Sequence, residues 1–360
     1  VTGMLGRGNT SAGIRIIDGA TGNTIGGATA IEGNLIAANG AGILIDGEAS
    51  DANIARNNRI GVNAGGGALA NGGNGVSVRN GADDSVLSDN WIAGNGAAGI
   101  AIDGPSSGTV IRGNRIGTDS AGTAALGNAG DGIRVAGGAS NTTIGGTAAQ
   151  RNIISGNTGN GVAIDGANDN RVSGNYIGTT ATGDGALANA EAGVVIRSAS
   201  TGNTIGTDLD GMDDLLEGNV IAGNAQDGVA IQDSGSDLNK VAGNVIGLGI
   251  DASTVVPNGL HGVRITGGAS DNVIGGTSAE ARNVISGNDD FGVLIGGSNS
   301  SGNQVLNNFI GTDGTGELAR ANLDGIVIDN APANVVGQGG AGNVVAGNTY
   351  YGIWVDGAGS

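Results

Sequence analysis

The chain has 360 residues, including 77 Gly, two Phe, two Trp, three Tyr, three Pro and no Cys. The absence of Cys excludes disulfides and thiolate metal sites, and a single His excludes a histidine metal cluster. The formal net charge of -18 argues against nucleic acid as a partner, since such a surface repels phosphates. No apolar run is long enough for insertion into a membrane.

A short motif, Gly-[Ile/Val]-x-[Ile/Val], recurs along the whole chain about every 31 residues. Between successive copies lies an Asn-x-[Ile/Val] segment, and a third short segment such as Asn23-Thr24-Ile25 precedes it. This alternation of β-branched residues predicts strands with one buried face. The motif glycines are Gly13, Gly42, Gly75, Gly99, Gly132, Gly161, Gly193, Gly228, Gly262, Gly292, Gly325 and Gly352.

Three short strands per repeat predict an all-β parallel β-helix of about 11 to 12 coils, with residues 1–360 as a single domain. At the strand spacing of a sheet, the rod would be roughly 50 Å long. Glycines are expected at the corners. Asparagines repeated at one fixed corner are expected to form a ladder of side-chain amides.

The repeats vary in length in two places. Some insert residues after the first strand, as in 144–152, and others after the second strand, as in 116–128. Both insertions fall at fixed edges of the predicted rod. Solenoid proteins commonly carry their variable functions in such loops.

The segments IGTDSAG, GNAGDGIRVAGGASNTTIGG and RNIISGN, between Ile116 and Asn157, resemble the bacterial right-handed parallel β-helix repeat proteins of the pectate-lyase-like superfamily. The resemblance covers residues 9–360. It implies a right-handed coil and a secreted or cell-surface protein. It does not specify an activity, because this superfamily contains lyases, epimerases and phage tailspikes as well as non-catalytic adhesive repeats.

A catalytic site is not expected. The outward strand positions hold no carboxylate, whereas a glycosidase needs two and a calcium-dependent lyase needs several. His261, in the corner before Gly262, has no catalytic partners nearby in sequence and is expected to be an exposed loop residue. The alternative is a lyase or epimerase acting on acidic polysaccharide, with Arg59 and Arg115 contacting the substrate.

Large side chains occupy the outward position of the second strand. Arg59, Trp91 and Arg115 lie on three successive coils, a spacing that would place the indole between two guanidinium groups. Together with Tyr176 and Phe309 they form a predicted stripe for binding sugars or docking a partner. In the alternative interpretation, the neighbouring insertions fold over the stripe and bury it.

One insertion, DLDGMDDLLEG, is unusually acidic. A flexible loop with five carboxylates could hold calcium, which takes six to eight oxygen ligands. No cofactor is required by the sequence, and a solvated acidic loop is the competing interpretation because the spacing does not match a twelve-residue calcium loop. The five candidate ligands are Asp208, Asp210, Asp213, Asp214 and Glu217.

The sequence begins mid-coil and shows no capping segment at either end. Tyr350, Tyr351 and Trp354 cluster on the last coil. Uncapped coils expose unpaired strand edges, so we expect either a segment of a longer β-helix or a subunit that stacks head to tail into a filament. The sequence as a whole predicts an extracellular or cell-surface structural or adhesive rod without catalytic residues, whose partners are further copies or polysaccharides.

Overall fold

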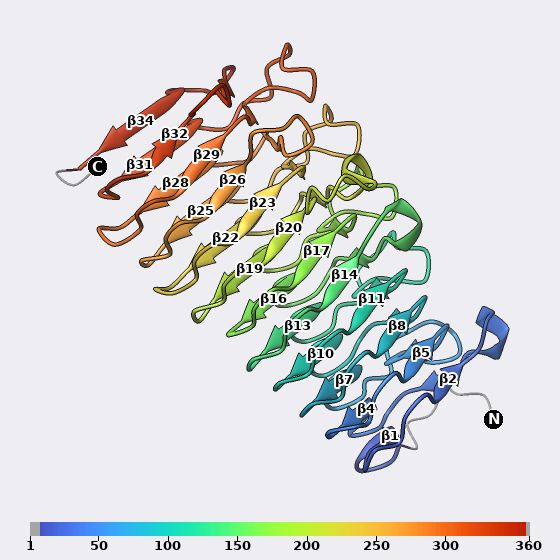
Figure 1. The fold of residues 1–360 in the computed structure, drawn as a ribbon. Helices are drawn as coiled ribbons and strands as arrows, with labels where there is room; N and C mark the ends of the chain where they lie inside the picture. Colours follow the sequence, from blue (N-terminus) through green and yellow to red (C-terminus); the bar gives the residue numbers. More distant parts are fainter. Residues whose placement is uncertain (1–7, 358–360) are drawn as a thin grey trace.

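The computed structural model describes residues 8–357, which form a rod of stacked coils (Figure 1). Each coil adds one strand to each of three parallel sheets, here called A, B and C. The architecture is the parallel β-helix that the repeat predicted. Parallel strands of one sheet are connected with right-handed crossovers in nearly all proteins.

The strand bounds follow the three sequence segments closely. Sheet A contains β1 (Ala12–Ile16), β4 (Ala41–Asp46), β7 (Val76–Arg79), β10 (Ile100–Asp103), β13 (Ile133–Ala136), β16 (Val162–Asp165), β19 (Val194–Arg197), β22 (Val229–Gln232), β25 (Val263–Thr266), β28 (Val293–Gly296), β31 (Ile326–Asp329) and β34 (Ile353–Asp356). Sheet B contains β2 (Thr24–Gly26), β5 (Ile54–Arg56), β8 (Val86–Ser88), β11 (Val110–Arg112), β14 (Thr143–Gly145), β17 (Arg171–Ser173), β20 (Thr204–Gly206), β23 (Lys240–Ala242), β26 (Val273–Gly275), β29 (Gln304–Leu306) and β32 (Val335–Val336). Sheet C contains β3 (Leu35–Ile36), β6 (Arg59–Ile60), β9 (Trp91–Ile92), β12 (Arg115–Ile116), β15 (Ile153–Ile154), β18 (Tyr176–Ile177), β21 (Val220–Ile221), β24 (Val245–Ile246), β27 (Val284–Ile285), β30 (Phe309–Ile310) and β33 (Val344–Val345).

Helical structure within residues 8–357 is limited to three short 3₁₀ turns in insertions that follow sheet B strands. None of them is long and apolar enough to cross a membrane. They are η1 (Ala30–Glu32), η2 (Ala148–Gln150) and η3 (Asp214–Leu216).

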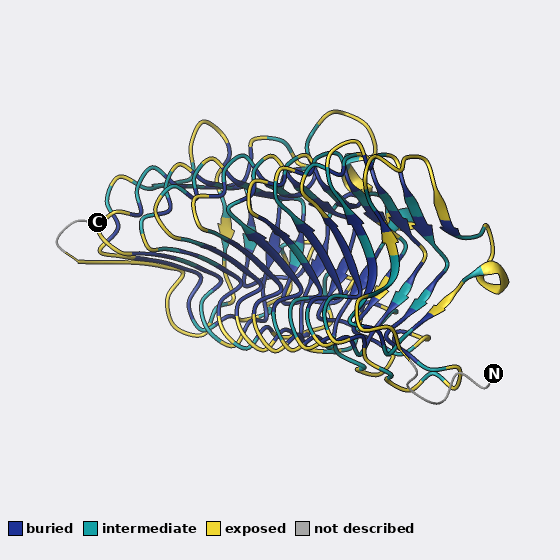
Figure 2. Cartoon of the chain, turned by 90° about the horizontal axis from the view of Figure 1, so that it is seen from below, coloured by how far each residue is buried: buried dark blue, intermediate teal, exposed yellow. Residues whose placement is uncertain are grey.

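The core is a column of aliphatic side chains inside the coils. Figure 2 shows that buried residues, in dark blue, follow the strands along the rod. In sheet A, Ile45 pairs with Val78 of the next coil, and both side chains are fully buried. The same inward position repeats in every sheet, so one continuous cluster extends from Ile16 to Ala331. Burial of stacked Ile and Val, rather than aromatic packing, therefore stabilises the rod.

Asparagine ladders run along all three corners, whereas the sequence predicted a ladder at one. In each ladder an Asn side chain donates from Nδ2 to the Oδ1 of the Asn one coil later. The corner before sheet A carries an uninterrupted ladder with Nδ2–Oδ1 distances of 2.8–3.1 Å. Its members are Asn9, Asn39, Asn71, Asn95, Asn128, Asn157, Asn189, Asn224, Asn258, Asn288, Asn322 and Asn348.

The corner before sheet C carries a second uninterrupted ladder, from Asn34 to Asn343, with Nδ2–Oδ1 distances of 2.9–3.1 Å. The ladder before sheet B is interrupted. Ser85, Thr109 and Thr142 replace Asn on three successive coils, and their buried hydroxyls have no hydrogen-bond partner within the described residues. The polar interior is thus fully paired along two corners only.

Candidate functional site

Alternate coils carry a loop directly after their sheet C strand, and each loop is closed by an antiparallel bridge between its end residues. These are the second-strand insertions predicted from the sequence. The five loops are Val62–Ala68, Thr118–Ala125, Thr179–Ala186, Leu248–Val255 and Thr312–Ala319.

The last four loops hydrogen-bond to one another through their backbones. Ala181 N–H donates to the Gly122 carbonyl at 2.8 Å, and Ile250 N–H donates to the Gly183 carbonyl at 2.9 Å. Gly314 N–H donates to the Ala252 carbonyl at 2.8 Å. These loops therefore form a continuous second layer beside the outer face of sheet C.

This loop layer determines which residues of the predicted stripe are exposed to solvent. Tyr176 was expected to face solvent, but its ring is only 5% exposed and packs with Ile153 and Val220. The guanidinium of Arg151 lies 3.9 Å from the ring centroid. For Tyr176 the alternative interpretation is therefore correct: a loop and an arginine cover its ring, and it is not an outward binding residue.

Phe309 is half-buried by the same kind of arrangement. The guanidinium of Arg282 lies 4.2 Å from its ring centroid, and a Cβ added to Gly316 of the overlying loop would lie 3.1 Å from the ring. Phe309 is therefore held in a packed position rather than presented to a ligand.

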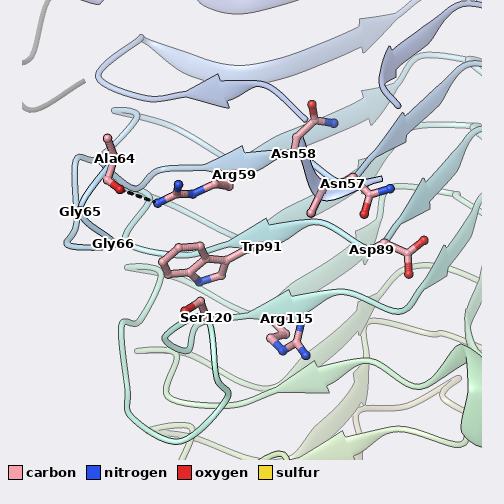
Figure 3. A pocket seen from close by; sticks show the side chains of 11 residues that line it. Asn57, Asn58, Arg59, Ala64, Gly65, Gly66, Asp89, Trp91, Arg115 and Ser120 are labelled. Carbon is pink, nitrogen blue, oxygen red and sulfur yellow. Dashed lines mark hydrogen bonds between the residues drawn. The ribbon is translucent and has the colours of Figure 1, made fainter. Parts of the chain in front are cut away.

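The layer is interrupted between the first two loops. No hydrogen bond joins Val62–Ala68 to Thr118–Ala125 within the described part of the chain. The interruption opens a groove with a volume of about 390 Å³ (Figure 3). It is lined by Ala30, Asn57, Asn58, Arg59, Ala64, Gly65, Gly66, Asp89, Trp91, Arg115 and Ser120.

Trp91 is fixed within this groove by contacts to both flanking loops. The guanidinium of Arg59 lies 5.2 Å from the centroid of its ring system, and Arg59 also donates to the carbonyls of Asn63 and Ala64 at 2.9 and 3.2 Å. Trp91 Nε1 donates to the Thr118 carbonyl at 2.6 Å. The indole is thereby oriented before any ligand arrives.

Arg115 lies on the other side of Trp91, one coil further along sheet C (Figure 3). Its side chain is exposed and makes no hydrogen bond or ion pair within residues 8–357. The expected sandwich of the indole between two arginines is not formed, since only Arg59 stacks on it. The groove thus combines an ordered indole with one unpaired guanidinium.

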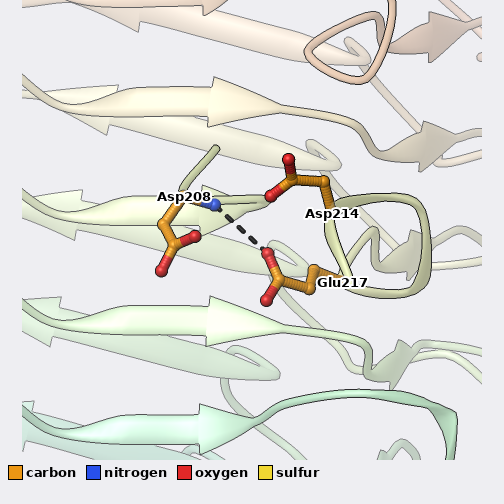
Figure 4. A group of neighbouring side chains, drawn as sticks. All are labelled: Asp208, Asp214 and Glu217. Atoms are coloured by element: carbon orange, nitrogen blue, oxygen red, sulfur yellow. Dashed lines mark hydrogen bonds between the residues drawn. The ribbon is translucent and has the colours of Figure 1, made fainter. Parts of the chain in front are cut away.

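The acidic insertion brings three of its five predicted ligands together. One carboxylate oxygen from each of Asp208, Asp214 and Glu217 lies within 4.8 Å of the others (Figure 4). Asp210 and Asp213 do not join them. Arg171 pairs with both Asp208 and Glu217, so a guanidinium from within the chain offsets one of the three negative charges of the cluster.

Replacing Arg171 with Gln is expected to destabilise the protein by about 3 kcal/mol, because buried Glu217 would lose its charge partner. Urea denaturation at pH 7 measures this loss of unfolding free energy. Arg112→Gln, at an exposed position of the same sheet, is the matched control and should shift stability by less than about 0.5 kcal/mol.

Calcium should stabilise the Arg171 variant and leave the stability of the natural chain unchanged. Calcium stabilisation of the natural chain would show that Arg171 does not occupy the cation position.

His261 is buried, whereas the sequence predicted an exposed loop residue. Its ring stacks on Phe291 with 5.1 Å between centroids, and its Nδ1 lies 3.5 Å from an Asp290 carboxylate oxygen. The backbone N–H of His261 donates to buried Asp227, which pairs with Arg264 at 2.7 Å. Asp227, Asp290 and Phe291 lie on the coils adjacent to that of His261, so nearness in sequence could not reveal them.

Burial lowers the pKa of the His261 imidazole, and Arg264 adds to this effect, against the opposing carboxylates of Asp227 and Asp290. Below the ordinary histidine pKa, the unfolded chain therefore binds a proton that the folded chain resists. Stability is expected to fall as the pH drops from 7.5 to 5.5. Thermal melting across this range should show a smaller slope for His261→Gln. Equal slopes for the two proteins would contradict this assignment.

The three aromatic residues predicted at an end interface lie on and beside the last sheet A strand. Tyr350, Tyr351 and Trp354 are 70%, 59% and 39% exposed. The rings of Tyr351 and Trp354 are tilted against each other with 5.9 Å between centroids. They form an exposed aromatic cluster on and beside β34, the last described strand of sheet A.

No protein-family model and no curated protein matches the chain. Solved structures with a similar course of the chain include the periplasmic alginate epimerase AlgG, at 15% identity and a TM-score of 0.42, with 86% of this chain and 64% of that one covered. The A-module of the Azotobacter vinelandii mannuronan C-5 epimerase AlgE6 is 14% identical with a TM-score of 0.46, over 90% and 82% of the two chains.

The Dettilon tailspike protein is 13% identical with a TM-score of 0.42, over 84% of this chain and 62% of its own. The chain thus spans less than two thirds of the AlgG epimerase and of the tailspike. At these identities the similarity concerns the fold alone.

Proposed function

We propose that this parallel β-helix is a rigid extracellular rod that binds acidic polysaccharide without cleaving it. The observation that carries the proposal is the groove in which an oriented Trp91 lies beside the unpaired guanidinium of Arg115. The rod supplies a fixed framework for this groove because each lining strand is hydrogen-bonded to the coils on both sides.

The chemistry of the groove fits a charged sugar. An indole face packs against the apolar face of a sugar ring, and its polar edge is already satisfied by the Thr118 carbonyl. A guanidinium recognises a carboxylate through two parallel hydrogen bonds. Arg115 is free to make that contact, whereas Arg59 is held by two carbonyls and serves mainly to position the indole.

Binding is favoured over catalysis by the ionisable groups that line the groove. Asp89 is the single carboxylate among the lining residues, and His, Lys and Tyr are absent from that lining. Hydrolysis of a glycosidic bond uses two carboxylates. A lyase or epimerase needs a group that removes a proton from the sugar, and Asp89 alone would have to serve.

Calorimetric titration with oligomers of galacturonate and of mannuronate tests the proposal. Trp91→Ala and Arg115→Gln are each expected to weaken binding at least tenfold. Arg15→Gln removes the same charge from an exposed position on sheet A and should leave binding unchanged. Absence of saturable binding to every acidic oligomer would overturn the proposal, and release of new sugar products would replace it with the enzyme alternative.

We propose in addition that copies of this chain associate head to tail. This proposal is supported by the exposed aromatic cluster of Tyr350, Tyr351 and Trp354 on and beside β34. Stacking a second copy would cover this cluster, as would a further coil of the same polypeptide.

Sedimentation velocity over a hundredfold range of concentration tests this association. Larger species are expected to grow with concentration in the natural chain and to diminish in a Tyr351→Ser, Trp354→Ser variant. A monomer at every concentration would refute head-to-tail pairing while leaving the polysaccharide proposal intact.

A further inference from the structure

We infer that the groove exists because one hydrogen bond of the loop layer is missing, and that its two unpaired backbone groups, the Ser120 N–H and the Gly66 carbonyl, bind a sugar hydroxyl. This inference rests on the proposed polysaccharide function and specifies how the ligand is held.

The loop layer follows a positional rule. Counting each loop from its first bridge residue, the third residue donates its N–H to the carbonyl of the fifth residue of the preceding loop. Ala181 pairs in this way with Gly122, and Ile250 pairs with Gly183. Gly314 and Ala252 repeat the pattern. Every junction between the last four loops therefore uses the same two positions.

The same rule assigns Ser120 and Gly66 to the first junction, since they are the third and fifth residues of their loops. Neither the Ser120 N–H nor the Gly66 carbonyl has a hydrogen-bond partner within the described residues. Both residues instead line the groove beside Trp91 (Figure 3). The groove thus occupies the position where the layer would otherwise be joined.

Loop length explains the missing bond. The loops Thr118–Ala125 and Thr179–Ala186 each contain eight residues, as do the two that follow, whereas Val62–Ala68 contains seven. Three of those seven are Gly65, Gly66 and Gly67, which carry no side chains to fill the space. The shorter loop therefore leaves the junction open and the indole accessible.

At the closed junctions, the outward sheet C residue of the intervening coil is buried. The sheet C residues of the intervening coils, Ile153, Val220 and Val284, are each at most 8% exposed. Trp91 occupies the equivalent position and remains partly exposed. A hydroxyl can accept from Ser120 N–H and donate to the Gly66 carbonyl at once. A sugar ring stacked on Trp91 would thus replace the missing loop contact.

A loop exchange tests the inference. Replacing residues 62–68 with the eight-residue sequence TDSAGTAA, taken from 118–125, is expected to close the junction. Amide hydrogen exchange of Ser120 should then slow at least tenfold without ligand, and galacturonate and mannuronate oligomers should bind at least tenfold more weakly. Placing TDSAGTAA at 179–186, where loop length is unchanged, is the control and should alter neither property.

In the natural chain, an oligomer that binds should itself slow exchange of the Ser120 amide. The inference is overturned if the exchanged loop leaves Ser120 unprotected, or if binding proceeds with Ser120 exchange unaffected. Failure of the natural chain to bind any acidic oligomer would instead refute the proposed function, and protection of Ser120 in the exchanged loop would still report on the junction.

Discussion

Replacing Asn114 with Ala is expected to destabilise the surrounding coils by about 4 kcal/mol, since several buried polar groups would each lose a partner worth roughly 1–3 kcal/mol. Asn114 is fully buried. Its Oδ1 accepts from both the backbone and the side chain of Asn90. Its Nδ2 donates to the Leu87 carbonyl at 2.8 Å and to Asn152 at 3.0 Å.

The matched control is Asn34→Ala, at the exposed first described position of the same ladder, where Oδ1 receives no donor from residues 8–357. Its cost should stay near 1 kcal/mol or below. Urea denaturation combined with hydrogen exchange of the neighbouring amides measures both, because a stacked repeat can open locally before it unfolds globally. Similar losses for the two variants would show that the ladder contributes little beyond its exposed ends.

Replacing Gly145 with Ala is expected to cost roughly 5 kcal/mol or more and to prevent normal folding, an effect at the upper end for single substitutions. Gly145 has a φ of +93°, and a Cβ added there would lie 2.0 Å from the Ser173 carbonyl oxygen. That oxygen belongs to the paired strand of the next coil. The clash is therefore with backbone that cannot move without separating the coils.

Gly138→Ala is the control variant, because it measures the cost of backbone strain in the absence of a steric clash. Gly138 has a similar φ of +90°, but a Cβ added there meets no atom within 4 Å. Its expected cost is about 1–2 kcal/mol, the strain of a left-handed conformation alone. Circular dichroism, soluble yield and melting temperature compare the two proteins. A Gly145 variant as stable as the Gly138 variant would mean that neighbouring coils can separate to accommodate a methyl group.

The fold could be predicted from the sequence because the residues that face inward recur in the same pattern in every coil. Gly75 and most of its counterparts lie directly before a sheet A strand, Gly42 lies near the start of β4, and the aliphatic residues after them alternate with a period of two. Since every coil repeats the same pattern, strand order and register followed from alignment of the repeats. The three asparagine corners were also present in the sequence, although only one was interpreted as a ladder.

The surface was harder to predict because it depends on what folds over an outward position. Trp91 and Val220 occupy the same outward position on coils that lie between two loop-bearing coils, yet the loops leave the first accessible and cover the second. The difference lies in loop length and in pairing between loops two coils apart. That comparison was available in the sequence, since Val62–Ala68 is one residue shorter than the other loops.

His261 illustrates a second reason. Its neighbours in the sequence are uninformative, but the residues before the motif glycines stack from coil to coil. Asp227 and Phe291 precede Gly228 and Gly292 as His261 precedes Gly262. Alignment by these glycines would have brought an acid and an aromatic ring beside the imidazole, and would have predicted a buried histidine.

Tryptophan fluorescence provides the most direct test of the binding groove. The chain has two Trp, so Trp354→Phe leaves Trp91 as the only indole. Titration of this variant with oligomers of galacturonate and mannuronate is predicted to give a saturable change in emission, and titration with a neutral glucan should give none. Unchanged emission at concentrations where calorimetry shows binding would place the ligand elsewhere on the rod and contradict the account of the groove.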